Sequence, residues 1–133
     1  MHENASILVV DDNPMNLKLA TAVLQKSGYR VRTAQTAKEA LALIDEEVPS
    51  LILMDIQMPE MDGLTLTRKL KSEARTREIF IVAFTAAAMK GDRERALDAG
   101  CEAYMTKPID TRTLRARIGE FLASRTAPSG DVQ

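Results

Sequence analysis

Short segments with strand character alternate five times with segments of helical periodicity, and this alternation constrains the fold more than any other feature of the sequence. The predicted strands are residues 7–10, 29–33, 51–55, 79–84 and 102–105. Alternating strands and helices assemble as a parallel sheet with helices on both faces. The sequence therefore predicts an α/β domain with a doubly wound, five-stranded parallel sheet.

The character of each strand predicts its place in the sheet. The first, third and fourth segments are apolar throughout, as strands buried on both faces are, whereas residues 29–33 and 102–105 have mixed patterns typical of edge strands. Right-handed crossovers then favour the order 2-1-3-4-5, the flavodoxin-like arrangement. In this order the winding reverses between strands one and three, and the ligand crevice is expected there.

Capping residues predict where the helices begin. Asn13-Pro14 is typical of an N-cap followed by a first helical position, and Thr36 opens a capping box. A helix over residues 86–99 is predicted with Gly91 inside it, and Asp110 is expected to cap the last helix. We assign residues 1–124 to one domain and residues 125–133, which lack periodicity, to a flexible tail.

Polar side chains follow four of the five predicted strands. Asp11 and Asp12 follow the first strand, Asp55 ends the third, Thr85 follows the fourth and Lys107 the fifth. Taken singly, each is an ordinary turn or cap residue, but the carboxyl ends of parallel strands meet at one edge of the sheet. Three carboxylates gathered in one cleft repel one another, so a cation should compensate them. Oxygen ligands of this kind suit Mg²⁺.

These residues match what phosphoryl transfer requires. Asp55 would be the nucleophile that accepts a phosphoryl group, a role that carboxylates fill in aspartyl-phosphate enzymes. Mg²⁺ would bridge Asp12, Asp55 and one phosphoryl oxygen, while Lys107 and the Thr85 hydroxyl would hold the other two.

The motifs VVDDN, LMDIQMPEMDG, FTA and KP occur in this order, and the chain resembles the receiver domain of two-component response regulators over residues 6–122. The resemblance implies that Asp55 receives its phosphoryl group from a phosphohistidine on a sensor histidine kinase or a histidine phosphotransfer protein. Such a domain catalyses its own phosphorylation and dephosphorylation but is not a turnover enzyme on an external substrate.

The same resemblance implies a fuller ligand set for the magnesium ion. Asp12 would bind it directly, Asp11 largely through water, and Gln57 through its backbone carbonyl. The Lys107–Pro108 bond is a candidate for the cis form, which proline makes accessible.

The resemblance also implies a switch. Thr85 would move toward the phosphoryl group, and we hypothesise that Tyr104 rotates inward as it does. The changed surface of the fourth helix, fifth strand and fifth helix would then bind a downstream protein, whose identity the sequence does not disclose. A dimer that forms on phosphorylation is left open.

Composition excludes several other classes. No apolar run approaches the roughly 20 residues that span a bilayer, and the N-terminus lacks the basic region of a signal peptide. The single cysteine, Cys101, fits the reducing cytoplasm and is expected to be a packed residue. A net charge of −1 and 4% aromatic residues argue against direct binding of nucleic acid.

We interpret the chain as a stand-alone receiver without an effector domain. The same residues leave three alternatives. DDNPMN resembles receivers of hybrid histidine kinases, so the chain could be cut from such a protein. A dehalogenase-like phosphohydrolase also uses an Asp nucleophile after a strand, but its Asp-x-Asp spacing is not found at Asp11-Asp12-Asn13. A receiver used only as an unphosphorylated scaffold is a third alternative, against which the complete acidic set argues.

Overall fold

A parallel sheet of five strands lies at the centre of the computed structural model, which describes residues 5–56, 63–85, 91–106 and 110–126. The strand order is β2-β1-β3-β4-β5, as the sequence predicts. The elements are β1 (Ser6–Val10), α1 (Pro14–Lys26), β2 (Arg30–Ala34), α2 (Ala37–Glu46), β3 (Leu51–Asp55), α3 (Gly63–Ser72), β4 (Phe80–Thr85), α4 (Asp92–Ala99), β5 (Ala103–Thr106) and α5 (Thr111–Thr126). The doubly wound, flavodoxin-like fold is therefore confirmed.

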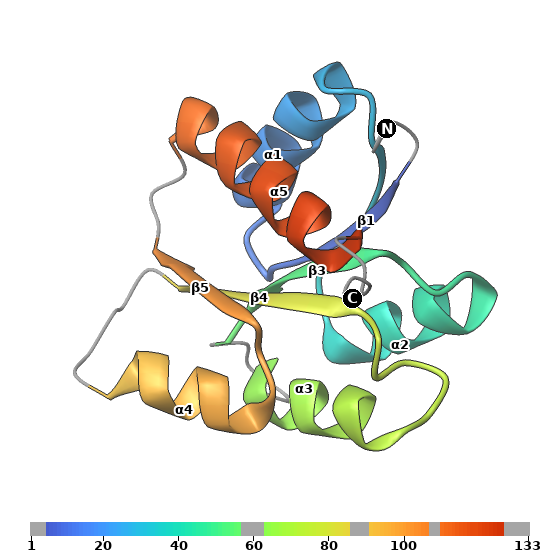
Figure 1. The fold of residues 1–133 in the computed structure, drawn as a ribbon. Coiled ribbons are helices and arrows are strands. Elements are labelled where there is room, and N and C mark those ends of the chain that lie inside the picture. The colour runs from blue at the N-terminus through green and yellow to red at the C-terminus, as the bar shows by residue number, and fades with distance from the viewer. Residues whose placement is uncertain (1–4, 57–62, 86–90, 107–109, 127–133) are drawn as a thin grey trace.

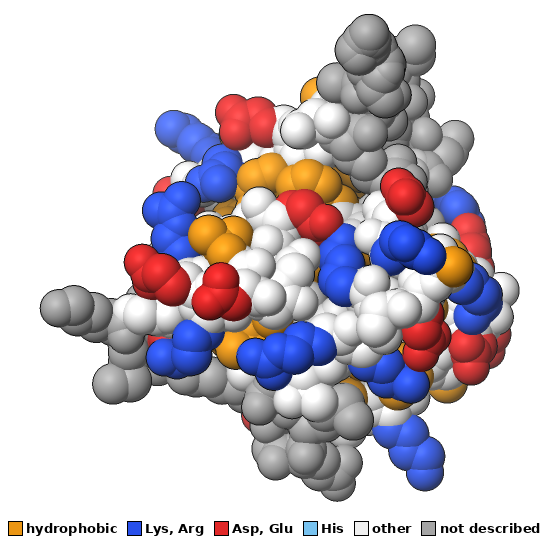
Figure 2. Space-filling view, turned by 60° about the horizontal axis from the view of Figure 1, so that its bottom comes forward, with side chains coloured by type: hydrophobic (Ala, Val, Ile, Leu, Met, Phe, Trp, Pro, Cys, Tyr) orange, Lys and Arg blue, Asp and Glu red, His pale blue; other side chains and the backbone are white. Residues whose placement is uncertain are grey.

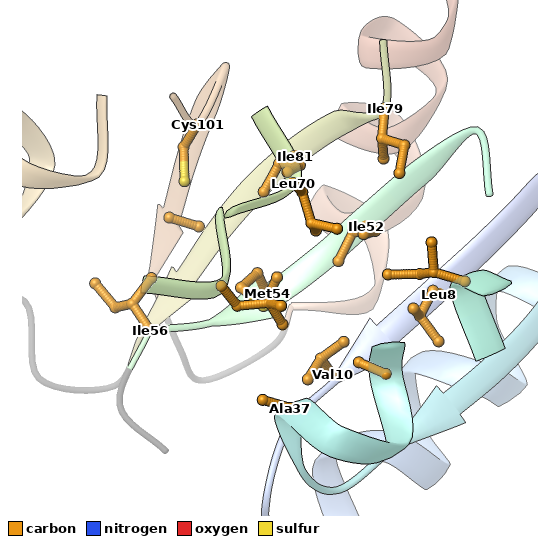
Figure 3. Close-up of a cluster of buried hydrophobic side chains, with 14 of the residues drawn as sticks. Leu8, Val10, Ala37, Ile52, Met54, Ile56, Leu70, Ile79, Ile81 and Cys101 are labelled. Carbon is orange, nitrogen blue, oxygen red and sulfur yellow. The ribbon is translucent and has the colours of Figure 1, made fainter. Parts of the chain in front are cut away.

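Helices cover both faces of the sheet. Helices α1 and α5 lie on one face, and α2, α3 and α4 lie on the other (Figure 1). Alternate side chains of β3 enter the two hydrophobic cores: Leu51 and Leu53 pack with α1 and α5, whereas Ile52 and Met54 pack on the opposite face (Figure 3). This alternation explains why β3 is apolar at every position before Asp55.

The predicted N-caps are present. The Asn13 side chain accepts a hydrogen bond from the Met15 backbone N–H at 2.9 Å, and Pro14 occupies the first turn of α1. Thr36 Oγ1 accepts one from the backbone N–H three residues later at 3.0 Å, and Asp110 Oδ1 accepts two at the start of α5. Each cap satisfies backbone donors that have no partner within the helix.

The prediction for α4 was wrong at its start. Gly91 does not lie inside the helix but is its N-cap, with a left-handed φ of 90°, and the helix begins at Asp92. This φ is incompatible with the right-handed helix that the sequence predicts through this position. Strands β2, β4 and β5 each begin one residue later than predicted, and α5 continues to Thr126.

An ionic network ties the edge strand β5 to α3. Lys71 Nζ lies 2.5 Å from Glu102 Oε2 and also donates to the backbone carbonyl oxygen of Ile79 at 2.7 Å. Glu102 Oε1 accepts a hydrogen bond from the Ile81 N–H of β4 at 2.7 Å. A single carboxylate therefore connects a helix, the start of β4 and the segment that leads into β5.

Candidate functional site

Three carboxylates converge at the carboxyl edge of the sheet. β1 and β3 are neighbours, and Val10 pairs with Met54, so Asp11 and Asp55 follow paired residues on adjacent strands. One oxygen each from Asp11, Asp12 and Asp55 lie within 4.8 Å of one another. The fold thus gathers the three acidic residues that the sequence singles out, although more than 40 positions separate the pair from the third.

Asp11 is fixed in this group by hydrogen bonds to both carboxylate oxygens. Its side chain is fully buried; Oδ1 accepts from the Asn13 N–H at 2.9 Å, and Oδ2 accepts from Asn16 Nδ2 at 3.2 Å. The sequence did not single out Asn16 as a site residue. Its position in the first turn of α1, three residues after the N-cap, is the signal that could have identified it, because that turn faces the loop from β1.

The other two carboxylates differ in exposure. Asp12 is exposed and accepts no hydrogen bond from another described residue, whereas Asp55 is only 4% exposed. An exposed carboxylate beside a buried one forms a cluster that is open to solvent on one side. Such a cluster can exchange water and small ions without opening the core.

Thr85 lies on the strand next to Asp55. In the pairing of β3 with β4, Asp55 is opposite Phe84, so Thr85 is one residue further toward the carboxyl edge. The Thr85 side chain is fully buried. Thr85 in turn pairs with Thr106, the last residue of β5, which immediately precedes Lys107 in the chain. Lys107, Pro108 and Gln57 lie outside the described residues.

Tyr104 lies on β5, within electrostatic range of the first turn of α4. It is half-buried and packs against the hydrophobic core on the α2–α3–α4 face. Burial raises the pKa of its hydroxyl, and the nearby Asp92 carboxylate adds to the increase. Asp92 is itself buried and forms an ion pair with Arg95. Tyr104 therefore contacts the core and lies within electrostatic range of a charged pair on α4.

The carboxylate cluster fits a hard divalent cation. Oxygens on opposite sides of an octahedral Mg²⁺ are about 4.2 Å apart, and adjacent ones about 3.0 Å. The three carboxylate oxygens, all within 4.8 Å of one another, need only small adjustments to reach these separations. The donor set consists of oxygen atoms alone, which suits Mg²⁺ rather than a softer metal.

None of the helices in the described segments is both long and apolar enough to span a membrane.

Comparison with known proteins places this chain in a family. The family model for the response regulator receiver domain matches residues 7–119. The polar-differentiation response regulator DivK of Brucella ovis is 44% identical over 119 residues, which is 86% of this chain and 97% of the relative.

Solved structures agree with the fold. A CheY-like receiver domain protein from Methanospirillum hungatei superposes with a TM-score of 0.86 at 33% identity, covering 93% of this chain and 98% of that chain. The receiver domain of a histidine kinase from Syntrophus aciditrophicus gives a TM-score of 0.82 at 30% identity, covering 90% of this chain and 91% of that one. The family model, the Brucella relative and the sheet order agree: this chain belongs to the family of response regulator receiver domains.

Proposed function

We propose that Asp55 accepts a phosphoryl group from a phosphohistidine on a sensor histidine kinase or a histidine phosphotransfer protein, and that this modification switches a protein-binding surface. The observation that carries the proposal is the convergence of Asp11, Asp12 and Asp55 at the carboxyl edge of the sheet. Family membership supports the choice of donor, since receiver domains act with these proteins.

In the proposed transfer an Asp55 carboxylate oxygen attacks the phosphorus atom. A phosphorus–oxygen bond forms, the phosphorus–nitrogen bond to the donor imidazole breaks, and the imidazole leaves with the electron pair. Mg²⁺, bound by Asp11, Asp12, Asp55 and the Gln57 carbonyl, would supply positive charge to the phosphoryl oxygens. Asp12 is the exposed member and suits direct binding, whereas both oxygens of Asp11 already accept hydrogen bonds, which suits contact through water.

Thr85 and Lys107 would hold the remaining phosphoryl oxygens. The register of β4 with β5 supports this pairing of roles, because Thr85 lies opposite the residue that precedes Lys107. Movement of the buried Thr85 hydroxyl would change the space available to Tyr104 on β5. This is the proposed coupling between chemistry at Asp55 and the surface formed by α4, β5 and α5.

The output is expected to be a protein contact. Residues 1–124 would form the receiver and residues 125–133 a tail, whose first two residues are the last two of α5. By analogy with the name of the Brucella relative, the pathway would be one of polar differentiation. A surface that binds nucleic acid directly concentrates positively charged side chains, and the described part of the face that carries α3 and α4 does not. On the face that carries α3 and α4, Lys and Arg side chains are interspersed with Asp and Glu (Figure 2).

The test is incubation with acetyl phosphate and Mg²⁺, followed by intact-mass measurement. The wild-type protein should gain one phosphoryl group, and Asp55→Asn should gain none because an amide is not a useful nucleophile. Asp98→Asn, an exposed change on α4, is the matched control and should react as the wild type does. Equal incorporation by Asp55→Asn would refute the assignment of the acceptor.

A further inference from the structure

Gly63, the first residue of α3, packs directly against the backbone of the proposed phosphoacceptor. A Cβ atom at this position would lie 2.4 Å from the Asp55 carbonyl oxygen and 2.8 Å from the Ile56 Cα. It would also lie 2.8 Å from Met54 Cγ. Two of these three atoms belong to the main chain of β3 and the residue after it, so rotation of a side chain cannot relieve the overlap.

A hydrogen bond within α3 and contacts with the core hold the first turn of α3 in this position. Thr67 Oγ1 donates a hydrogen bond to the Gly63 carbonyl oxygen at 2.7 Å, and the Thr67 side chain is fully buried. Leu66 and Leu70 anchor the same helix in the core beneath the sheet. Because these contacts resist movement of α3, part of the displacement that an added side chain at Gly63 causes should fall on the end of β3.

The size of the displacement follows from the distances. Real Cβ contacts essentially never lie under 3.0 Å, so the Asp55 carbonyl and the α3 turn would have to separate by at least 0.6 Å. The Asp55 carboxylate shares a cluster with two others, and their oxygens lie within 4.8 Å of one another, whereas opposite ligands of an octahedral Mg²⁺ are only about 4.2 Å apart. A misplacement of about 1 Å in a reacting group can cost on the order of a hundredfold in rate.

We propose that Gly63 is a positioning residue for phosphoryl transfer: the absence of a side chain there sets where the Asp55 carboxylate lies relative to Asp11 and Asp12. The inference rests on the proposed function. Gly63 itself does not contact the phosphoryl group in this proposal. A side chain added at Gly63 would act through the Asp55 main chain, so the substitution should change the Mg²⁺ affinity and the maximal phosphorylation rate together.

The experiment compares Gly63→Ala with Gly119→Ala. Gly119 is a matched control because it lies within α5 and an added Cβ would meet only the Tyr29 hydroxyl, at 4.0 Å. For each folded protein, Mg²⁺ affinity is measured from the shift of the urea midpoint, and phosphorylation is followed against acetyl phosphate concentration at saturating Mg²⁺. Gly63→Ala should lose about tenfold or more in maximal rate and bind Mg²⁺ more weakly, whereas Gly119→Ala should match the wild type in both.

A purely structural role for Gly63 predicts a different result. Gly63→Ala would then lower the urea midpoint while the maximal rate and Mg²⁺ affinity of the folded protein stay at wild-type values, and this outcome overturns the proposal. If Gly63→Ala does not fold, Thr67→Val replaces it: loss of the tether to the Gly63 carbonyl should lower the maximal rate severalfold, and a wild-type rate overturns the proposal. If the wild type takes no phosphoryl group, the proposed function fails, and Mg²⁺ affinity alone decides on Gly63, with equal affinities counting against it.

Discussion

Replacing Asp12 with asparagine should stabilise the metal-free protein and at the same time weaken its response to Mg²⁺. The Asp12 carboxylate lies within 4.8 Å of two other carboxylates. At that separation two like charges repel by about 0.9 kcal/mol in water and by about 3.5 kcal/mol at an effective dielectric constant of 20. Because Asp12 is exposed, the value for water is the better guide. Removing its charge relieves the repulsion from both neighbouring carboxylates and should therefore raise the free energy of unfolding without metal by about 1 to 2 kcal/mol.

Magnesium should reverse the order of stabilities. A ligand that binds only the native state stabilises it by about 2.7 kcal/mol at one hundred times its dissociation constant. Wild-type protein should gain this increment as Mg²⁺ is added, whereas Asp12→Asn should gain much less because it has lost the exposed ligand of the cluster. The two unfolding curves are expected to cross as the Mg²⁺ concentration rises.

Urea unfolding at low ionic strength, in EDTA and across a Mg²⁺ series, measures both effects. Glu78→Gln is the control, since it removes an exposed carboxylate from the loop between α3 and β4. It should change neither the stability in EDTA nor the Mg²⁺ increment by a comparable amount. A destabilised Asp12→Asn in EDTA, or a wild-type Mg²⁺ increment in that variant, would refute the reasoning from charge convergence.

Three further outcomes are expected. Thr85→Ala should still be phosphorylated, but the Tyr104 ring signals in NMR spectra should no longer shift on phosphorylation; a shift of wild-type size would contradict the coupling. Glu102→Gln should lower the free energy of unfolding by about 1 kcal/mol because Lys71 loses its charged partner, and an unchanged urea midpoint would contradict this. Burial raises the pKa of the Cys101 thiol from 9.0 to about 11. The stability that this contributes is complete below pH 9.0 and is lost as the pH rises toward 11. Alkylation of the native protein at neutral pH should therefore be far slower than in urea, and equal rates would count against a buried thiol.

Much of the fold could be predicted from the sequence because pattern and burial agree. The apolar residues before Asp55 indicated a central strand, and β3 lies in the middle of the sheet. The mixed patterns around residues 29–33 and 102–105 indicated edges, where β2 and β5 lie. Parallel topology then forced Asp11, Asp12 and Asp55 to one edge without any knowledge of distances.

Other features depend on distances and backbone angles that no pattern records. The predicted helical pattern continued through Gly91, so the sequence did not reveal the left-handed φ of Gly91 at the N-terminus of α4. Asn16 resembled any polar residue of an exposed helix until the fold placed its amide 3.2 Å from Asp11. Gly63 is only the last residue of the motif LMDIQMPEMDG in the sequence, and the fold alone shows how closely it approaches the Asp55 carbonyl oxygen.

The central claim is that a divalent cation held by the clustered carboxylates makes Asp55 a phosphoryl acceptor, and the Mg²⁺ dependence of labelling tests it most directly. The rate of phosphoryl incorporation from acetyl phosphate is measured across a Mg²⁺ series, and the modified residue is located by peptide mass spectrometry. We predict a rate that saturates at the same Mg²⁺ concentration as the stability increment, with all of the label on Asp55. Incorporation that persists unchanged in EDTA, or label on a residue other than Asp55, would contradict the account.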